Sequence, residues 1–209
     1  MAYGIYGRES DWTTRLKHEA DERRFNQEPP YVAVANHAGP GNMLVHSLDS
    51  KQITANVECH RRGRQLGVFA IGACEACVLY PDGVPTPRRL LPDFQRDLSD
   101  LQDVIDDLNK GREDSPFTPI YLSAIPLDEE KAREYWTDDI FNNARFEEYD
   151  NAVREHAATT GADYIDLREG FDSDAMLAED AVHPNETGSQ FVYGKISKTV
   201  FRHLGISHP

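Results

Sequence analysis

Short apolar runs alternate with longer amphipathic stretches along the whole chain. Each run is rich in β-branched or aromatic residues and is followed by Gly, Pro, Asn or Asp. This pattern is typical of parallel strands that are buried on both faces. We therefore expect strands at 31–35, 66–71, 119–124 and 163–167.

The amphipathic stretches between these runs predict helices. In the clearest one, apolar residues recur from Phe94 to Leu108 at spacings of three and four, which places them on one buried stripe. The aspartates of this stretch fall mostly on its other faces, and we interpret them as a solvated surface rather than a metal site. They are Asp97, Asp100, Asp103, Asp106 and Asp107. Further helices are expected at 11–24, 142–160 and 186–203.

Glycines mark the expected ends of three helices. Gly111, Gly161 and Gly205 each follow the last periodic apolar position of a helix, where a left-handed residue commonly ends it. Helices that alternate with buried strands predict a three-layer α/β/α sandwich around a parallel sheet, in a flavodoxin-like order. We expect residues 1–209 to form a single domain, with the segments 80–87 and 135–141 as loops at the rim of its site.

Charge and composition narrow the range of partners. The 209 residues include 22 basic and 36 acidic side chains, a formal net charge of −14, which argues against nucleic acid and anionic membranes. The longest apolar run, 66–73, is far below the roughly 18 residues that span a bilayer, so we expect no membrane insertion. Three cysteines without framework spacing favour a cytoplasmic location, while secretion stays open because a leader could precede the sequence.

The strongest chemical signal is the Asp-x-x-His-Pro sequence of Asp180, His183 and Pro184, between the last expected strand and the last helix. Three residues apart on a tight loop, a carboxylate can orient an imidazole that acts as a general base. Pro184 disfavours helical geometry at His183 and so keeps it on the loop. In the alternative interpretation Asp180 caps the helix and His183 is an ordinary polar surface residue. The position of the motif directly before the last helix of an α/β chain favours catalysis.

This motif resembles the last block of SGNH/GDSL hydrolases, a family of serine esterases and lipases. The second block of that family is a strand followed by Asn-x-Gly-x-x-Gly, and residues 36–42 after the first expected strand are similar. The resemblance implies a catalytic pair of Asp180 and His183, with the N–H of Gly41 in the oxyanion hole. Glycine suits that role because no Cβ obstructs the approach of the oxyanion.

The third block of the family, Gly-x-Asn-Asp, is only partly matched. Here Gly72 is followed by Cys74 in place of the Asn and by Glu75 in place of the Asp. By resemblance Cys74 takes the oxyanion-hole position of that Asn, although a thiol is a weaker donor. Cys74 and Cys77 also form a Cys-x-x-Cys pair, but a single pair is a weak signal for zinc or for redox chemistry. We interpret them as two small buried residues.

The first block of the family, Gly-Asp-Ser followed by Leu, Ile or Met and then x-x-Gly, carries the nucleophilic serine. The opening Met1-Ala2-Tyr3-Gly4 resembles the residues that follow that serine. We therefore expect a strand that ends in Gly-Asp-Ser to precede Met1, so that the chain is truncated relative to the family.

The resemblance implies hydrolysis of a small-molecule ester through an acyl-enzyme, with no metal and no organic cofactor. The first alternative is a protein that keeps the SGNH fold and binds an acyl or carbohydrate ligand without chemistry, which the substitution at Cys74 favours. The second is a cysteine-based redox or hydrolytic protein that uses Cys74 beside His183. The intact Asp180–His183 motif argues against the first alternative, and the second ranks last.

Overall fold

The structure is a computed structural model that describes residues 12–26, 43–49, 51–59, 64–79, 85–136 and 139–206. Its helices are α1 (Trp12–Phe25), α2 (Leu44–Asp49), α3 (Gln52–Cys59), α4 (Ala73–Ala76), α5 (Leu91–Asn109), α6 (Glu129–Tyr135), α7 (Asn143–Thr160), α8 (Ser173–Met176) and α9 (Glu186–Leu204). Its strands are β1 (Gln65–Ala70), β2 (Val78–Leu79), β3 (Thr86–Pro87), β4 (Phe117–Leu122), β5 (Asp139–Ile140) and β6 (Asp163–Ile165). The strand expected at 31–35 lies outside the described residues.

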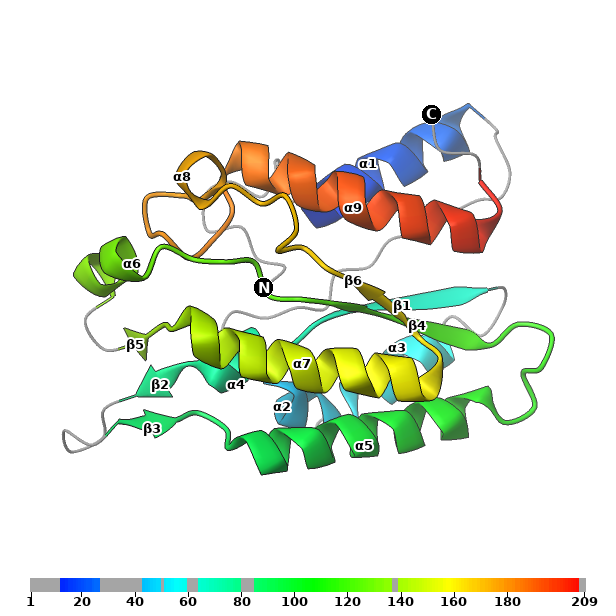
Figure 1. The fold of residues 1–209 in the computed structure, drawn as a ribbon. Coiled ribbons are helices and arrows are strands. Elements are labelled where there is room, and N and C mark those ends of the chain that lie inside the picture. The colour runs from blue at the N-terminus through cyan, green and yellow to red at the C-terminus, as the bar shows by residue number, and fades with distance from the viewer. Residues whose placement is uncertain are drawn as a thin grey trace.

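The central sheet confirms the expected parallel arrangement. Strands β1, β4 and β6 pair in the order β1-β4-β6, and both pairings are parallel. Val68 lies opposite Ile120, and Tyr121 lies opposite Tyr164. Parallel strands need crossover connections, and helices α5 and α7 supply them on one face of this sheet (Figure 1).

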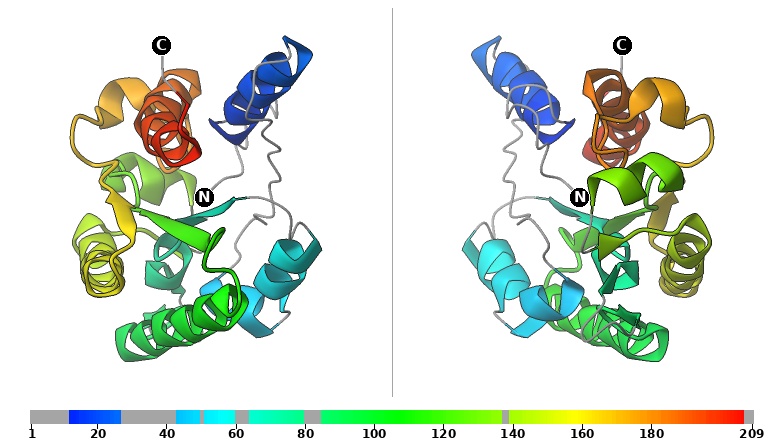
Figure 2. Two further views of the ribbon diagram at one scale, coloured as in Figure 1. Left: turned by 90° about the vertical axis from the view of Figure 1, so that its right-hand side faces the viewer. Right: turned by 90° about the vertical axis from the view of Figure 1, so that its left-hand side faces the viewer.

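The two faces of β4 belong to two different cores. Phe117 and Tyr121 pack with α5 and α7, whereas Ile120 and Leu122 pack with α1 and α9. Figures 1 and 2 show these helices as layers on opposite sides of the sheet. A strand whose residues are apolar on both faces is thus covered on both, as the uninterrupted apolar run predicted. The α/β fold with three layers is confirmed.

The helix ends also follow the prediction. Gly161 closes α7 and Gly205 closes α9, both in the left-handed conformation with φ of 73° and 71°. Lys110 ends α5, and Gly111 follows at φ 72°. These backbone angles are easily reached only by glycine, which explains why the helices stop there.

One aspartate of α5 contradicts the prediction of a solvated face. Asp97 is only 3% exposed and lies between the buried residues of the helix. Its two carboxylate oxygens accept hydrogen bonds from Nε and Nη2 of Arg89, at 2.8 and 2.6 Å. A paired guanidinium makes burial of this carboxylate tolerable. The other four aspartates of the set are exposed, as expected.

The segments expected as rim loops contain short strands. Thr86–Pro87 forms β3 and Asp139–Ile140 forms β5, and both pair antiparallel with β2. Residues 80–84 and 137–138 lie outside the described part of the chain. The two segments therefore lie in one small second sheet, on either side of β2. The spacing of apolar residues along the chain does not predict this pairing.

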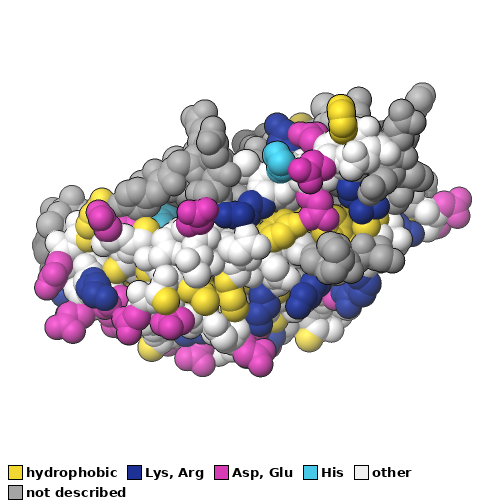
Figure 3. Space-filling model, turned by 90° about the horizontal axis from the view of Figure 1, so that it is seen from above, with side chains coloured by type: hydrophobic (Ala, Val, Ile, Leu, Met, Phe, Trp, Pro, Cys, Tyr) yellow, Lys and Arg dark blue, Asp and Glu magenta, His cyan; other side chains and the backbone are white. Residues whose placement is uncertain are grey.

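Charged side chains of both signs are intermixed on the face above α8 and α9 (Figure 3). Among the described helices, none is both long and apolar enough to cross a membrane.

Candidate active site

Asp180 and His183 lie in a tight loop between α8 and α9 (Figure 1). The two arms of the loop are held together by backbone hydrogen bonds. The N–H of Ala178 donates to the carbonyl of His183 at 2.8 Å, and the N–H of Asn185 donates to the carbonyl of Met176 at 2.9 Å. The Asp-x-x-His-Pro motif is thus held in a closed loop rather than on a free connection.

Asn185 fixes this loop to the start of α9. Its side-chain oxygen accepts a hydrogen bond from the N–H of Gly188 at 3.0 Å, which caps the helix. Its amide nitrogen donates to the carbonyl of Leu177 at 3.0 Å. Gly188 itself packs so closely that a Cβ there would lie 2.2 Å from the carbonyl oxygen of Met176. The glycine is therefore required for this close approach of loop and helix.

The structure brings the predicted pair into direct contact. Nδ1 of His183 lies 2.6 Å from Oδ2 of Asp180. The other oxygen, Oδ1, accepts hydrogen bonds from the N–H groups of His183 at 2.9 Å and Val182 at 3.1 Å. Asp180 is completely buried, and the side chain of His183 is 9% exposed. Because a carboxylate only accepts, Nδ1 is the nitrogen that carries a proton toward Asp180, and in the neutral imidazole Nε2 then keeps its lone pair.

The environment keeps Asp180 ionised. Burial alone would raise the pKa of this carboxyl, but the hydrogen bonds from the imidazole and the two backbone N–H groups outweigh it and hold the pKa below its ordinary value. A buried negative charge beside Nδ1–H stabilises the imidazolium that forms when Nε2 takes up a proton. The pair is therefore suited to general-base chemistry.

A small cavity lies at the carboxyl ends of β1 and β4 and borders the loop of the pair, although Asp180 and His183 themselves do not line it. Ala70 and Ser123 line it from the strand ends, and Val182 and Pro184 line it from the loop, on either side of His183. Open α/β sheets bind ligands at this edge. Ala73, the neighbour of Cys74 in α4, lines the same cavity, so the loop with the third block and the loop with His183 face one space. The other predicted oxyanion donor, Gly41, lies outside the described residues.

Cys74 and Cys77 form no disulfide with any residue that the structure describes. Cys77 is buried as expected, and its Sγ donates to the carbonyl of Ala73 at 3.1 Å, whereas Cys74 is only half-buried. The expectation of two buried residues is thus wrong for Cys74, because it lies in the first turn of a four-residue helix that leaves one side uncovered. No cluster of metal-ligating side chains is present among the described residues.

Glu75 has a structural role that the sequence did not indicate. Its carboxylate is 1% exposed and joins two segments that lie 28 residues apart in sequence. Oε1 accepts from the N–H of Leu44 at 2.6 Å, at the start of α2, and Oε2 accepts from the N–H of Gly72 at 3.0 Å. Burial raises the pKa of Glu75, and the backbone N–H groups oppose this rise. One carboxylate thus fixes the turn before Cys74 to the start of α2.

We expect Glu75→Gln to destabilise the protein by about 1–3 kcal/mol, the range for a buried polar group left without a partner. The amide keeps one acceptor but places an NH₂ group against one of the two N–H donors. The midpoint and slope of urea unfolding measure the change. The matched control is Glu113→Gln at an exposed position after α5. Equal stability of the two variants would contradict the role of Glu75 in joining the two segments.

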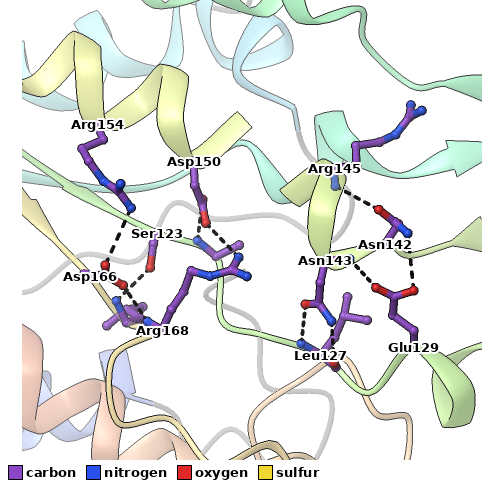
Figure 4. Close-up of polar contacts among 12 residues, drawn as sticks. Ser123, Leu127, Glu129, Asn142, Asn143, Arg145, Asp150, Arg154, Asp166 and Arg168 are labelled. Carbon is purple, nitrogen blue, oxygen red and sulfur yellow. Dashed lines mark hydrogen bonds and ion pairs between the residues drawn. The ribbon is translucent and has the colours of Figure 1, made fainter. Parts of the chain in front are cut away.

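A second buried polar cluster lies where the chain leaves β4 and β6 (Figure 4). Asp150 of α7 is 1% exposed; Oδ1 accepts from the N–H of Ala124 at 2.9 Å, and Oδ2 lies 3.3 Å from Nη1 of Arg168. Ser123 accepts from the N–H of Leu167 at 2.8 Å and so joins the two strand ends. Burial raises the pKa of Asp150 to about 6, although the N–H group and Arg168 oppose the rise.

No family model matches the sequence, and no curated protein matches it significantly. The fold, in contrast, matches solved structures of hydrolases. A lipase/acylhydrolase from Enterococcus faecalis is 18% identical with a TM-score of 0.64, over 93% of this chain and 89% of that chain. A carbohydrate esterase of family 3 from Talaromyces cellulolyticus is 16% identical with a TM-score of 0.60, over 93% and 91%. A protein assigned to the SGNH hydrolases from Slackia heliotrinireducens is 16% identical with a TM-score of 0.59, over 90% and 94%.

These matches span nearly the full length of both chains. The chain therefore has the fold of the SGNH-type hydrolases, as its Asp-x-x-His-Pro motif predicted. At such low identities the likeness concerns the fold, and the chemistry has to be argued from the residues of this chain.

Proposed function

We propose that this protein hydrolyses small-molecule esters through an acyl-enzyme, with His183 as general base and Asp180 as the carboxylate that orients it. The observation that carries the proposal is the 2.6 Å contact between Nδ1 of His183 and Oδ2 of a fully buried Asp180. Titratable groups with a shifted pKa and a specific charge partner cluster at functional sites, so this buried carboxylate beside an imidazole supports a catalytic role. Its loop borders a cavity at the strand ends, which supports the same role.

In the proposed reaction a serine hydroxyl attacks the acyl carbonyl while Nε2 of His183 accepts the serine proton. The imidazolium gives that proton to the leaving alcohol, and an acyl-enzyme remains. Water then attacks the acyl group in the same way, its proton passes through Nε2 back to the serine, and the acid is released. The family resemblance implies that this hydroxyl belongs to the serine of a Gly-Asp-Ser block.

Oxyanion stabilisation is proposed to come from the N–H of Gly41 and from Cys74. The loop of Cys74 borders the same cavity as the loop of His183, through Ala73 and Val182, which supports this assignment. Because a thiol is a weaker donor than the family's Asn, and loss of one such donor costs about 10²–10³ in turnover, we expect modest rates.

A second candidate function is binding without chemistry. The substitution at Cys74 favours it, since a hole with a weak donor suits a site that holds an acyl or carbohydrate ligand without turnover. Carbohydrate esterases and lipases both occur among the proteins of similar fold, so acetylated sugars and short acyl esters are the ligands to test.

The test is an assay of the complete protein encoded by the gene, including any codons in frame before Met1. We expect it to hydrolyse 4-nitrophenyl acetate with an initial burst of one nitrophenol per active site, which is the signature of an acyl-enzyme. Calorimetric titration with an acetylated xylose oligomer forms the second arm. Binding without release of acetate would overturn the esterase proposal in favour of the second candidate.

A further inference from the structure

Two consecutive carbonyl groups of the catalytic loop are held from outside the loop. Nε1–H of Trp136 donates to the carbonyl of Asp180 at 3.1 Å, and the N–H of Asp128 donates to the carbonyl of Ala181 at 3.2 Å. Asp128 is the N-cap of α6 and Trp136 is its C-cap. The two ends of one short helix thus contact the peptide units on either side of Ala181.

The backbone of the loop is strained at this point. Ala181 has φ of +60° and is 2% exposed. A left-handed alanine costs on the order of 1–2 kcal/mol and persists only where the surroundings enforce it. The same turn directs the N–H groups of Val182 and His183 toward Oδ1 of Asp180. Relaxation of Ala181 would therefore disturb the carboxylate that orients His183.

The helix that holds the loop is itself anchored. The side chain of Asn143, at the start of α7, accepts from the N–H of Leu127 at 3.1 Å and donates to its carbonyl at 2.9 Å. Oε1 of Glu129 accepts from the N–H of Asn143 at 2.8 Å. Figure 4 shows these contacts between α6 and α7. Since Phe146 and its neighbours fix α7 in the core, α6 is connected to a rigid part of the fold.

The indole ring of Trp136 also borders the imidazole. Its centroid lies 6.2 Å from that of His183, and it also packs against Phe141 at 5.6 Å in an edge-to-face arrangement. An aromatic ring at this position limits the access of water to the Asp180–His183 hydrogen bond, which strengthens it. Trp136 thus combines a hydrogen bond to the backbone of the loop with cover for its side chains.

We propose that residues 127–136 form a clamp that holds the strained turn at Ala181, and that Trp136 is its main positioning residue for the Asp180–His183 pair. The expected effect on turnover rests on the proposed function. The expected effect on the Asp180–His183 hydrogen bond does not. Residues that position a catalytic side chain without touching the substrate typically contribute 10- to 100-fold to activity.

The test is Trp136→Phe, which keeps an apolar ring against Phe141 but removes the N–H donor. We expect the far-downfield proton resonance of Nδ1–H of His183 to broaden or disappear, because the hydrogen bond exchanges faster with water. In the complete protein we expect kcat to fall about 10- to 100-fold while KM changes less than about twofold. The matched control is Tyr193→Phe in α9, which also removes one polar group from an aromatic side chain but breaks a hydrogen bond to Glu19 that lies outside the clamp.

Asn143→Ala supplies a second variant, because it cuts the anchor of the clamp far from the imidazole. We expect it to broaden the same resonance while the melting temperature falls only slightly. An unchanged His183 resonance in both folded variants would overturn the clamp. A changed resonance in a protein that hydrolyses no ester would instead support the clamp and count against the proposed function, so the two failures can be told apart.

Discussion

Replacing His183 with alanine is expected to lower the rate of ester hydrolysis by the complete protein about 10⁶-fold. Without Nε2 no group accepts the proton of the nucleophile, and only binding and oxyanion stabilisation remain. Initial rates with 4-nitrophenyl acetate measure the loss. The matched control is His18→Ala on the exposed face of α1, where the side chain contacts Glu22 at the surface.

The partner variant Asp180→Asn gives a graded result. We expect a fall of about 10⁴-fold, smaller than for His183, because the imidazole remains but its tautomer and orientation are no longer fixed. The Asn side chain places either an amide oxygen or an NH₂ group near Nδ1, while the carboxylate of Asp180 accepts there at 2.6 Å. Equal rates for Asp180→Asn and the unchanged protein would remove Asp180 from the mechanism, and unchanged turnover in His183→Ala would remove the imidazole.

The features that could be predicted from sequence are those whose cause is local. The glycines that end α7 and α9 could be predicted because each follows directly after the last regularly spaced apolar residue of its helix. Strand β4 was visible because it is apolar on both faces. The contact of Asp180 with His183 was predictable for the same reason, since the two residues are three apart on one turn and the partner is encoded in the motif.

The features that could not be predicted join residues far apart in the chain. Glu75 reaches Leu44 across 31 positions, and Trp136 reaches Asp180 across 44. Hydrophobic periodicity reports which face of an element is buried, but it does not identify the partner of a buried polar group. These contacts hold the segments around the Asp180–His183 loop, and neither could be predicted from the motif itself.

Asp150 is an intermediate case, because a signal was present. It follows Phe146 by four positions and precedes Val153 by three, which places a carboxylate on the buried stripe of α7. A charged residue at such a position requires partners in the interior. The structure supplies the N–H of Ala124 and the guanidinium of Arg168. The identity of these partners depended on the packing of α7 against the ends of β4 and β6.

This buried carboxyl is expected to make stability depend on pH. Burial raises the pKa of Asp150 to about 6, above the ordinary value of 3.8 that it regains in the unfolded chain. Between these values the folded protein holds a proton that the unfolded chain releases. The contribution of this group is therefore fully present below about pH 4 and is lost as the pH rises to about 6, a change on the order of 3 kcal/mol.

Asp150→Asn removes this titration while it keeps an oxygen for the N–H of Ala124. We expect the difference in unfolding free energy between the variant and the unchanged protein to vary by about 3 kcal/mol from pH 4 to pH 7, with urea melts at each pH as the measurement. Asp103→Asn on the exposed face of α5 controls for the loss of one negative charge. A difference that stays constant across this range would show that Asp150 is ionised throughout, and that Arg168 compensates its burial more fully than the pKa of about 6 implies.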